Sequence, residues 1–238
     1  EEITEHSKEY EMRDSSGYSI PHTGEELYLV YSMKAYNKLK ANRLESYIQD
    51  TYKFSSKGEH TFFTLNNGVR FSHWNFNKES IFSPRVSLGI VPAFNHDVTL
   101  RFATGLYYQS SFFKELRDTS TVNGITYATL NKKIKSQRSI HFIAAFDYRF
   151  KLNQRPFKFT AEAYYKALSN MVPYSVNNVK IVYNSDQQCS GHAYGLDLKL
   201  YGEFVPETDS WISLSLMNTK LNIGGNSVPM PTDQRYSL

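Results

Sequence analysis

The chain has 238 residues, a formal net charge of +4 and 40% hydrophobic residues, among them 18 tyrosines and 16 phenylalanines but only 2 tryptophans. So many aromatic residues exclude a disordered chain, and the small, dispersed positive charge does not indicate nucleic-acid binding. No apolar run approaches the length of a transmembrane helix, and the single cysteine, Cys189, excludes an internal disulfide framework.

Residues 1–26 form a polar lead-in, which we interpret as a loop of a larger parent barrel. From residue 27 onward, apolar and polar residues alternate with period two, as in antiparallel strands with two different faces. The alternation predicts about nine strands of roughly 10 to 15 residues, at 27–37, 43–54, 60–75, 81–94, 98–109, 137–150, 157–168, 191–204 and 210–221. Within the third strand, Asn66, Asn67 and Gly68 predict a bulge in preference to a hairpin turn.

Strand length and loop length both favour a membrane-spanning sheet. Soluble strands most often have about 5–6 residues, whereas a tilted strand that crosses a bilayer needs about 9–11. Short polar turns near 55–59, 95–97, 151–155 and 205–209 alternate with connections of variable length at 39–42, 111–136 and 169–190. Outer-membrane barrels have this arrangement, with short turns on one rim and long loops on the other.

We therefore predict an all-β protein, an antiparallel transmembrane β-barrel segment that forms an open, curved sheet. Phe102, Phe142, Leu198 and Leu214 should lie on its convex, lipid-facing side. An Arg or Lys placed there would cost about 2–4 kcal/mol near the membrane centre, so the polar residues should face the lumen. The lumen-facing candidates are Arg70, Arg85, Arg101, Asp147, Arg149, Glu162, Asp197 and Lys199.

None of these residues is predicted to be catalytic. The carboxylates of Asp147, Glu162 and Asp197 alternate with Lys and Arg, so charge pairing explains them better than acid–base chemistry. The seven histidines form no His-x-His or Glu-x-x-His pair, and the sequence therefore predicts no metal site. We expect no cofactor and no enzymatic activity.

The two long loops are the candidate ligand-binding segments, because loops positioned by a rigid scaffold often carry its binding residues. Solvated loops with incidental aromatic residues account for the same composition equally well. The candidate ligand-binding residues are Phe112, Phe113, Lys114, Arg117, Tyr127, Tyr174 and Tyr183.

Several segments resemble the barrel of TonB-dependent outer-membrane receptors of the Bacteroidetes type. They are residues 46–54 (SYIQDTYKF), 82–88 (FSPRVSL), 103–110 (ATGLYYQS), 161–166 (AEAYYK), 201–204 (YGEF) and 210–213 (SWIS). The resemblance covers about residues 27–238 and implies that they are part of a barrel of about 22 strands. It also implies a plug domain and a TonB box, both of which this sequence lacks, and a location in the bacterial outer membrane.

By this resemblance, the partners would be outer-membrane lipid, the plug and remaining strands of the parent chain, and TonB through the missing N-terminal region. The implied function is energy-coupled uptake of an iron chelate, cobalamin, a glycan or a peptide. Two other classes stay open: a soluble or surface-anchored β-sandwich that binds a ligand or carbohydrate, and a small self-contained barrel. A sandwich would pack Phe102 and Phe142 between two sheets, whereas a barrel wall would leave them exposed.

Overall fold

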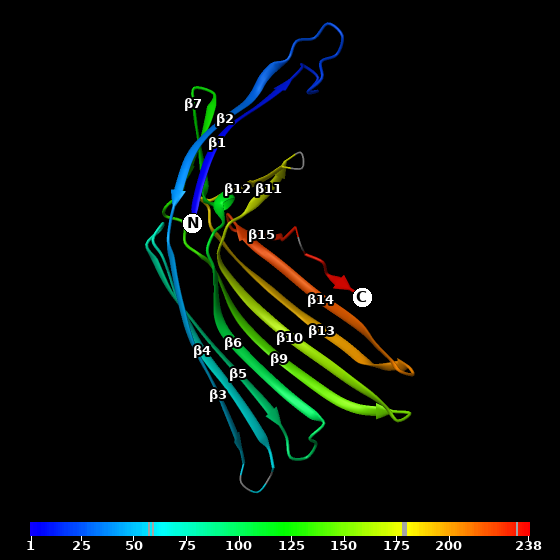
Figure 1. Ribbon diagram of the computed structural model, residues 1–238. Coiled ribbons are helices and arrows are strands. Elements are labelled where there is room, and N and C mark those ends of the chain that lie inside the picture. Colours follow the sequence, from blue (N-terminus) through cyan, green and yellow to red (C-terminus); the bar gives the residue numbers. More distant parts are fainter. Residues whose placement is uncertain (57, 59, 178–179, 232) are drawn as a thin grey trace.

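A computed structural model describes residues 1–56, 58, 60–177, 180–231 and 233–238. Its main feature is an antiparallel sheet that curves without closing (Figure 1). Among the described residues, its long strands are β3 (Arg43–Ser55), β4 (Phe62–Trp74), β5 (Glu79–Val91), β6 (Val98–Gln109), β9 (Gln137–Leu152), β10 (Arg155–Met171), β13 (Cys189–Val205) and β14 (Thr208–Ile223). They pair in chain order, and the short strands β15 (Asn226–Pro229) and β16 (Tyr236–Ser237) pair with β14. The predicted fold class is confirmed.

The remaining elements lie beyond one end of the long strands (Figure 1). A second sheet has the order β1-β2-β8-β7, in which β2 and β8 run parallel. Its members are β1 (Glu2–Arg13), β2 (Tyr28–Lys40), β7 (Arg117–Val122) and β8 (Ile125–Leu130). The loops also contain a short 3₁₀ helix, η1 (Phe113–Leu116), and a hairpin of β11 (Tyr174–Asn177) and β12 (Lys180–Tyr183). Where the chain is described, the opposite end of the main sheet carries only short turns, so the loops separate by length as predicted.

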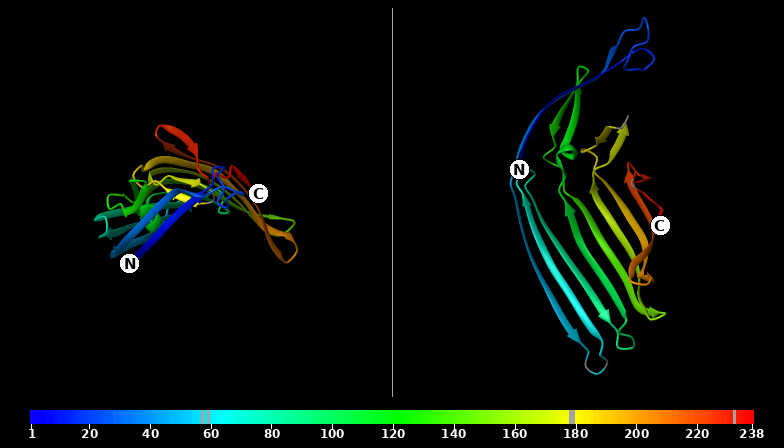
Figure 2. Two further views of the ribbon diagram at one scale, coloured as in Figure 1. Left: turned by 90° about the horizontal axis from the view of Figure 1, so that it is seen from above. Right: turned by 45° about the vertical axis from the view of Figure 1, so that its right-hand side comes forward.

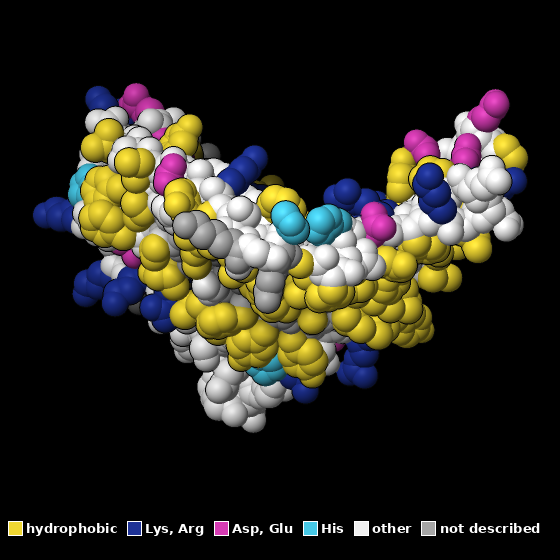
Figure 3. Space-filling model, turned by 90° about the horizontal axis from the view of Figure 1, so that it is seen from below, with side chains coloured by type: hydrophobic (Ala, Val, Ile, Leu, Met, Phe, Trp, Pro, Cys, Tyr) yellow, Lys and Arg dark blue, Asp and Glu magenta, His cyan; other side chains and the backbone are white. Residues whose placement is uncertain are grey.

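The two faces of the main sheet differ in character. Viewed from above it forms an arch (Figure 2), and apolar side chains gather along the convex side while charged side chains gather along the concave side (Figure 3). Phe102 and Phe142 are 47% and 53% exposed, and the pairing register places Leu198 and Leu214 on their face. These phenylalanines are not packed between two sheets, which contradicts the β-sandwich alternative. Within the described chain, no helix is long and apolar enough to cross a membrane.

Two local predictions are wrong. The pairing of β4 with β3 and with β5 runs without a register shift through Asn66, Asn67 and Gly68, so there is neither a bulge nor a hairpin. Gly68 instead allows a close approach, because a Cβ at this position would lie 3.0 Å from the carbonyl oxygen of Ile48.

The segment 39–42 is not a loop between paired strands, because β2 leads directly into β3 (Figure 1). The chain changes its partner here: the Ala41 N–H donates to the carbonyl of Glu1, and the Asn42 N–H donates to the side chain of Asn75.

The segment 1–26, interpreted as a polar lead-in, contains β1, which pairs with β2 along its whole length. The burial of β1 alternates residue by residue, but apart from Ile3 the less exposed positions are polar, among them Glu5 and Ser7. Hydrophobic periodicity therefore gives almost no signal for β1, because its place in the sheet comes from backbone pairing with β2 rather than from an apolar face.

The buried core lies at the junction between the main sheet and the loops rather than within the main sheet. We call it the rim core, and its members are Leu39, Ala41, Trp74, Leu116, Ile134 and Val172. They come from the β2–β3 junction, from the end of β4 and from both long loops. A single-layer sheet has no second layer to bury its faces, so its stable apolar packing has to form elsewhere.

Candidate functional site: the concave face and the loop rim

The residues predicted to face the lumen all lie on one face of the main sheet. The register aligns Arg101 with Ala145 and Glu162, and Glu162 with Asp197. The remaining members lie two or four residues away along the same strands, or on the corresponding face of β4 and β5. Charged groups from six strands are thereby gathered on the concave side. The assignment of that side to a barrel lumen stays a prediction.

Asp147 is the centre of the strongest charge cluster on this face. Its side chain is 8% exposed and accepts hydrogen bonds from Arg101 Nε at 2.7 Å and Thr160 Oγ1 at 2.7 Å. Lys158 Nζ lies 3.2 Å away. The carboxylate thus connects β6, β9 and β10 through both of its oxygens, as charge pairing predicts.

Replacing Asp147 with asparagine should lower the free energy of unfolding of the full-length protein by about 1–2 kcal/mol. The side chains of Arg101 and Lys158 are nearly half exposed and can regain water, which limits the loss. Chemical unfolding followed by tryptophan fluorescence measures the change. Arg149→Gln is the matched control, since Arg149 is exposed and has no ion pair in the described chain; an equal loss in both variants would contradict the assignment.

Glu162 and Asp197 behave differently from Asp147. They face each other directly across β10 and β13, and neither has an ion-pair partner among the described residues. Like charges at paired positions of a sheet repel. Charge pairing within the described chain therefore explains Asp147 but not Glu162 and Asp197. These two carboxylates are available to bind a cationic group on the concave side.

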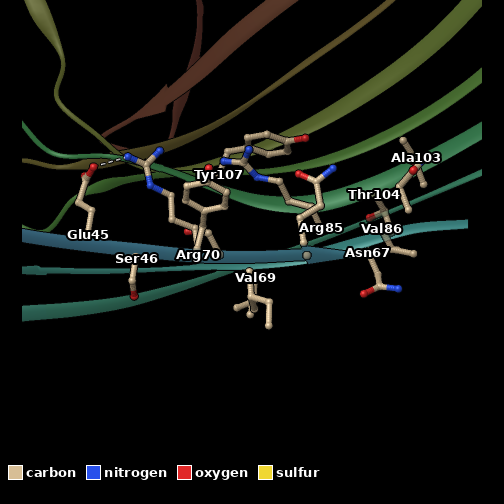
Figure 4. Close-up of a pocket in the computed structure, with 17 residues that line it drawn as sticks. Glu45, Ser46, Asn67, Val69, Arg70, Arg85, Val86, Ala103, Thr104 and Tyr107 are labelled. Carbon is tan, nitrogen blue, oxygen red and sulfur yellow. Dashed lines mark hydrogen bonds and ion pairs between the residues drawn. The ribbon is translucent and has the colours of Figure 1, made fainter. Parts of the chain in front are cut away.

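A second group of concave side chains lies toward the β3 edge. Figure 4 shows Glu45, Arg70, Arg85 and Tyr107 projecting to one side of the sheet, and Glu45 and Arg70 form an ion pair at 2.5 Å. The guanidinium of Arg85 lies 4.3 Å from the ring centroid of Tyr107, and that ring stacks on His141 at 4.1 Å. Cation–π and ring contacts of this kind hold the Arg85 charge over an aromatic platform.

The two long loops, 111–136 and 169–190, form the loop rim, and a half-buried carboxylate at the start of β5 holds it to the main sheet. Glu79 accepts hydrogen bonds from the N–H of Ser136 at 3.0 Å and from its hydroxyl at 2.6 Å. Asn77 donates to Glu79 at 3.1 Å and to the carbonyl of Ile134 at 3.0 Å. These bonds position the end of the first long loop, and with it Ile134, over the rim core.

The two long loops are also bound to each other. The Gln188 side-chain amide donates to the carbonyls of Lys135 at 2.7 Å and Asn170 at 2.9 Å. The Ser185 hydroxyl donates to the carbonyl of Arg117 at 2.7 Å, and the Asn131 amide donates to the carbonyl of Ser185 at 3.3 Å. Because these hydrogen bonds join the two loops, the loops behave as one folded unit rather than as two independent segments.

Three of the loop residues predicted to bind ligand come together. The ring of Phe112 contacts Tyr183 edge-on at 5.1 Å between centroids, and Tyr183 lies 5.8 Å from Tyr174. We call these three residues the rim aromatic cluster. Tyr127 is 39% exposed on β8, apart from them.

The other candidate loop residues have mixed surroundings. Phe113 packs against the rim core, Arg117 forms an ion pair with Glu5 of β1, and Lys114 is exposed. Beside them, burial raises the pKa of the Glu115 carboxyl above its ordinary value, although the Phe112 N–H and the Gln137 amide donate to it.

Sequence reasoning missed the polar residues that hold the rim together, above all Glu79, Ser136 and Gln188. Each is an isolated polar residue at a strand end or in a loop, and its partner is more than fifty residues away in sequence. No spacing rule predicts such pairs, whereas the alternation along each strand predicts the concave set.

A curved, single-layer antiparallel sheet with an apolar convex face, a charged concave face and loops of unequal length defines the wall of an outer-membrane type β-barrel. Residues 7–236 match the family model described as TonB dependent receptor-like, beta-barrel. The chain belongs to this family, which is located in the outer membrane and consists of transporters rather than enzymes. No curated protein and no solved structure matches the chain.

Proposed function

We propose that this chain forms part of the wall and of the extracellular loop rim of a receptor for energy-coupled uptake across the bacterial outer membrane. Residues 27–238 supply barrel strands and rim loops, and residues 1–26 supply the first strand and the loop of the β1–β2 hairpin at the rim. The transported ligand is an iron chelate, cobalamin, a glycan or a peptide. The protein has no enzymatic role.

The division of the main sheet into two faces carries this proposal. The apolar convex face suits contact with lipid, and the concave face gathers the charges that a water-filled or plugged lumen requires. Glu162 and Asp197, which have no cationic partner in the described chain, would meet the plug domain or the passing ligand on this side. Energy coupling would reach the barrel through the plug and TonB, as in the family.

The rim loops are the proposed ligand-contact region. Phe112 is 44% exposed although its ring contacts Tyr183, so an apolar contact surface is presented on a rigid support. Preorganised aromatic side chains bind ligands at low cost in conformational entropy. Both long loops contribute to this surface, which explains why they are bound to each other.

Uptake by cells that carry the full-length receptor tests the proposal. Labelled members of the four ligand classes are supplied with and without a proton-motive-force uncoupler, and uptake of one class should require both the receptor and energy. The double variant Phe112→Ser/Tyr127→Ser should then weaken binding of that ligand by about 1–2 kcal/mol for each aromatic ring removed, roughly tenfold per ring.

The change is confined to exposed side chains because deleting 115–135 would also remove Leu116 and Ile134 from the rim core. Val122→Ser is the control, since Val122 is 55% exposed on the same loop and is not one of the candidate ligand-binding residues. Receptor-independent uptake of all four ligand classes would overturn the transport proposal. Normal uptake by the double variant would overturn only the role of the loop residues.

A further inference from the structure

The loop of the β1–β2 hairpin brings together three side chains that can bind a metal ion. Asp14 follows directly after β1, and His22 and Glu25 lie later in the same loop. One ligand atom of each lies within 4.8 Å of the other two, and Asp14 Oδ2 is 3.0 Å from His22 Nδ1. The hairpin projects from the rest of the molecule (Figure 1), so this cluster is separate from the concave face and from the rim core.

The loop is folded around the Asp14 carboxylate. Asp14 Oδ1 accepts the N–H groups of Ser16 at 3.0 Å and Tyr18 at 2.8 Å, and Oδ2 accepts the N–H of His22 at 3.3 Å. The ring of Tyr18 packs edge-on against the His22 imidazole, with 4.8 Å between centroids. These contacts hold the Asp14 carboxylate and the His22 ring in place before any ion binds.

The second observation is an unsatisfied oxygen. Glu25 Oε2 is withdrawn from solvent and has no hydrogen-bond partner in the described chain, while the Asp14 side chain is completely enclosed. A buried carboxylate oxygen without a donor is costly, and a cation is the group that removes the cost. Two carboxylates beside an imidazole form a set of ligands whose negative charge a divalent ion offsets.

We propose that Asp14, His22 and Glu25 bind a divalent transition-metal ion, with Zn²⁺ the best match. Ligand atoms bound to Zn²⁺ at about 2.1 Å lie roughly 3.0–3.5 Å from one another. Asp14 and His22 are already 3.0 Å apart in a hydrogen bond that the ion would replace, and the three ligand atoms, now within 4.8 Å of one another, would draw together around it. An imidazole ligand favours Zn²⁺ over Ca²⁺ or Mg²⁺, both of which prefer oxygen. Three protein ligands leave a further position for water or for a group from another molecule.

The spacings His-x-His and Glu-x-x-His do not describe this site, for two reasons. His22 precedes Glu25 by three residues, so the order of the pair is reversed. Asp14 is eight residues upstream of His22 and joins them only because the loop folds back through Gly17 and Gly24, both at positive φ. The proposal therefore departs from the sequence-based expectation of no metal site.

Calorimetric titration of the full-length receptor, purified without a polyhistidine tag and treated with a chelator, tests the proposal. ZnCl₂ should bind at one site that is lost or weakened at least about tenfold in His22→Ala and in Glu25→Gln. Glu26→Gln is the matched control, because Glu26 is adjacent and exposed, and Zn²⁺ affinity should stay within about twofold. His22→Ala and Glu25→Gln both retain Asp14, around which the loop is folded. Heat-dependent electrophoretic mobility checks that each variant is folded.

Absence of Zn²⁺ binding by the unmodified receptor would overturn the proposal, as would equal affinity in both variants and the control. Ca²⁺ binding as tight as Zn²⁺ binding would overturn the transition-metal assignment. None of these outcomes depends on whether the receptor transports a ligand.

Discussion

Replacing Phe102 with arginine is expected to lower the free energy of unfolding of the full-length receptor in phospholipid vesicles by about 2–4 kcal/mol. Phe102 lies near the middle of β6 on the convex face and is 47% exposed, with no second layer of protein over it. At that depth a guanidinium would replace an aromatic ring in contact with hydrocarbon. Urea unfolding in vesicles, followed by heat-dependent electrophoretic mobility, measures the loss.

Ala103→Arg is the matched control, because the next residue along β6 points to the concave face. The same charge there faces water and should change stability by less than about 1 kcal/mol. Phe102→Ala separates the cost of the charge from the loss of the ring. Equal losses in Phe102→Arg and Ala103→Arg would contradict the assignment of the convex face to lipid.

Replacing Leu116 with alanine is expected to lower the free energy of opening of the loop rim by about 2–5 kcal/mol. Leu116 is 1% exposed within the rim core, between residues contributed by the strands and by both long loops. The cavity would loosen the loops without removing strand pairs from the main sheet. Hydrogen exchange should therefore become faster in β7, β8 and β11, while protection in β9 and β10 stays unchanged.

Val122→Ala provides the comparison for this prediction. Val122 belongs to the same loop, but it is 55% exposed and makes no contact with the rim core, so its truncation should leave exchange nearly unchanged. Faster exchange throughout the main sheet in Leu116→Ala would show that the rim core stabilises the whole chain. Unchanged exchange in the loops would show that it does not hold them.

The strands of the main sheet could be predicted because their evidence is local. Along β9, Phe142, Ala144 and Phe146 alternate with His141, Ala145 and Asp147, and one alternation predicts both the strand and its two faces. The same reasoning failed at Gly68, where a residue typical of turns and bulges lies in a regular strand. Its role depends on the neighbouring backbone of Ile48, which local sequence does not show.

The loops could be predicted only as loops. Sequence suggested Phe112, Tyr174 and Tyr183 as ligand-binding candidates from their aromatic character, and the structure brings these three together. It also gives Phe113 and Arg117 packing and ion-pair contacts within the rim, which composition does not reveal.

By itself the sequence determined the all-β class, the long strands of the main sheet and the charge of each face. A strand turns successive side chains to opposite sides whatever its surroundings, so these properties follow from local spacing. Only the tertiary structure decided that β1 is a strand, that β2 continues into β3, and that the loops fold together over the rim core. Those features depend on hydrogen bonds such as that from the Ser136 hydroxyl to Glu79, which lie 57 residues apart in the chain. They also depend on enclosed polar side chains such as Asp14. Such contacts form only once distant segments meet.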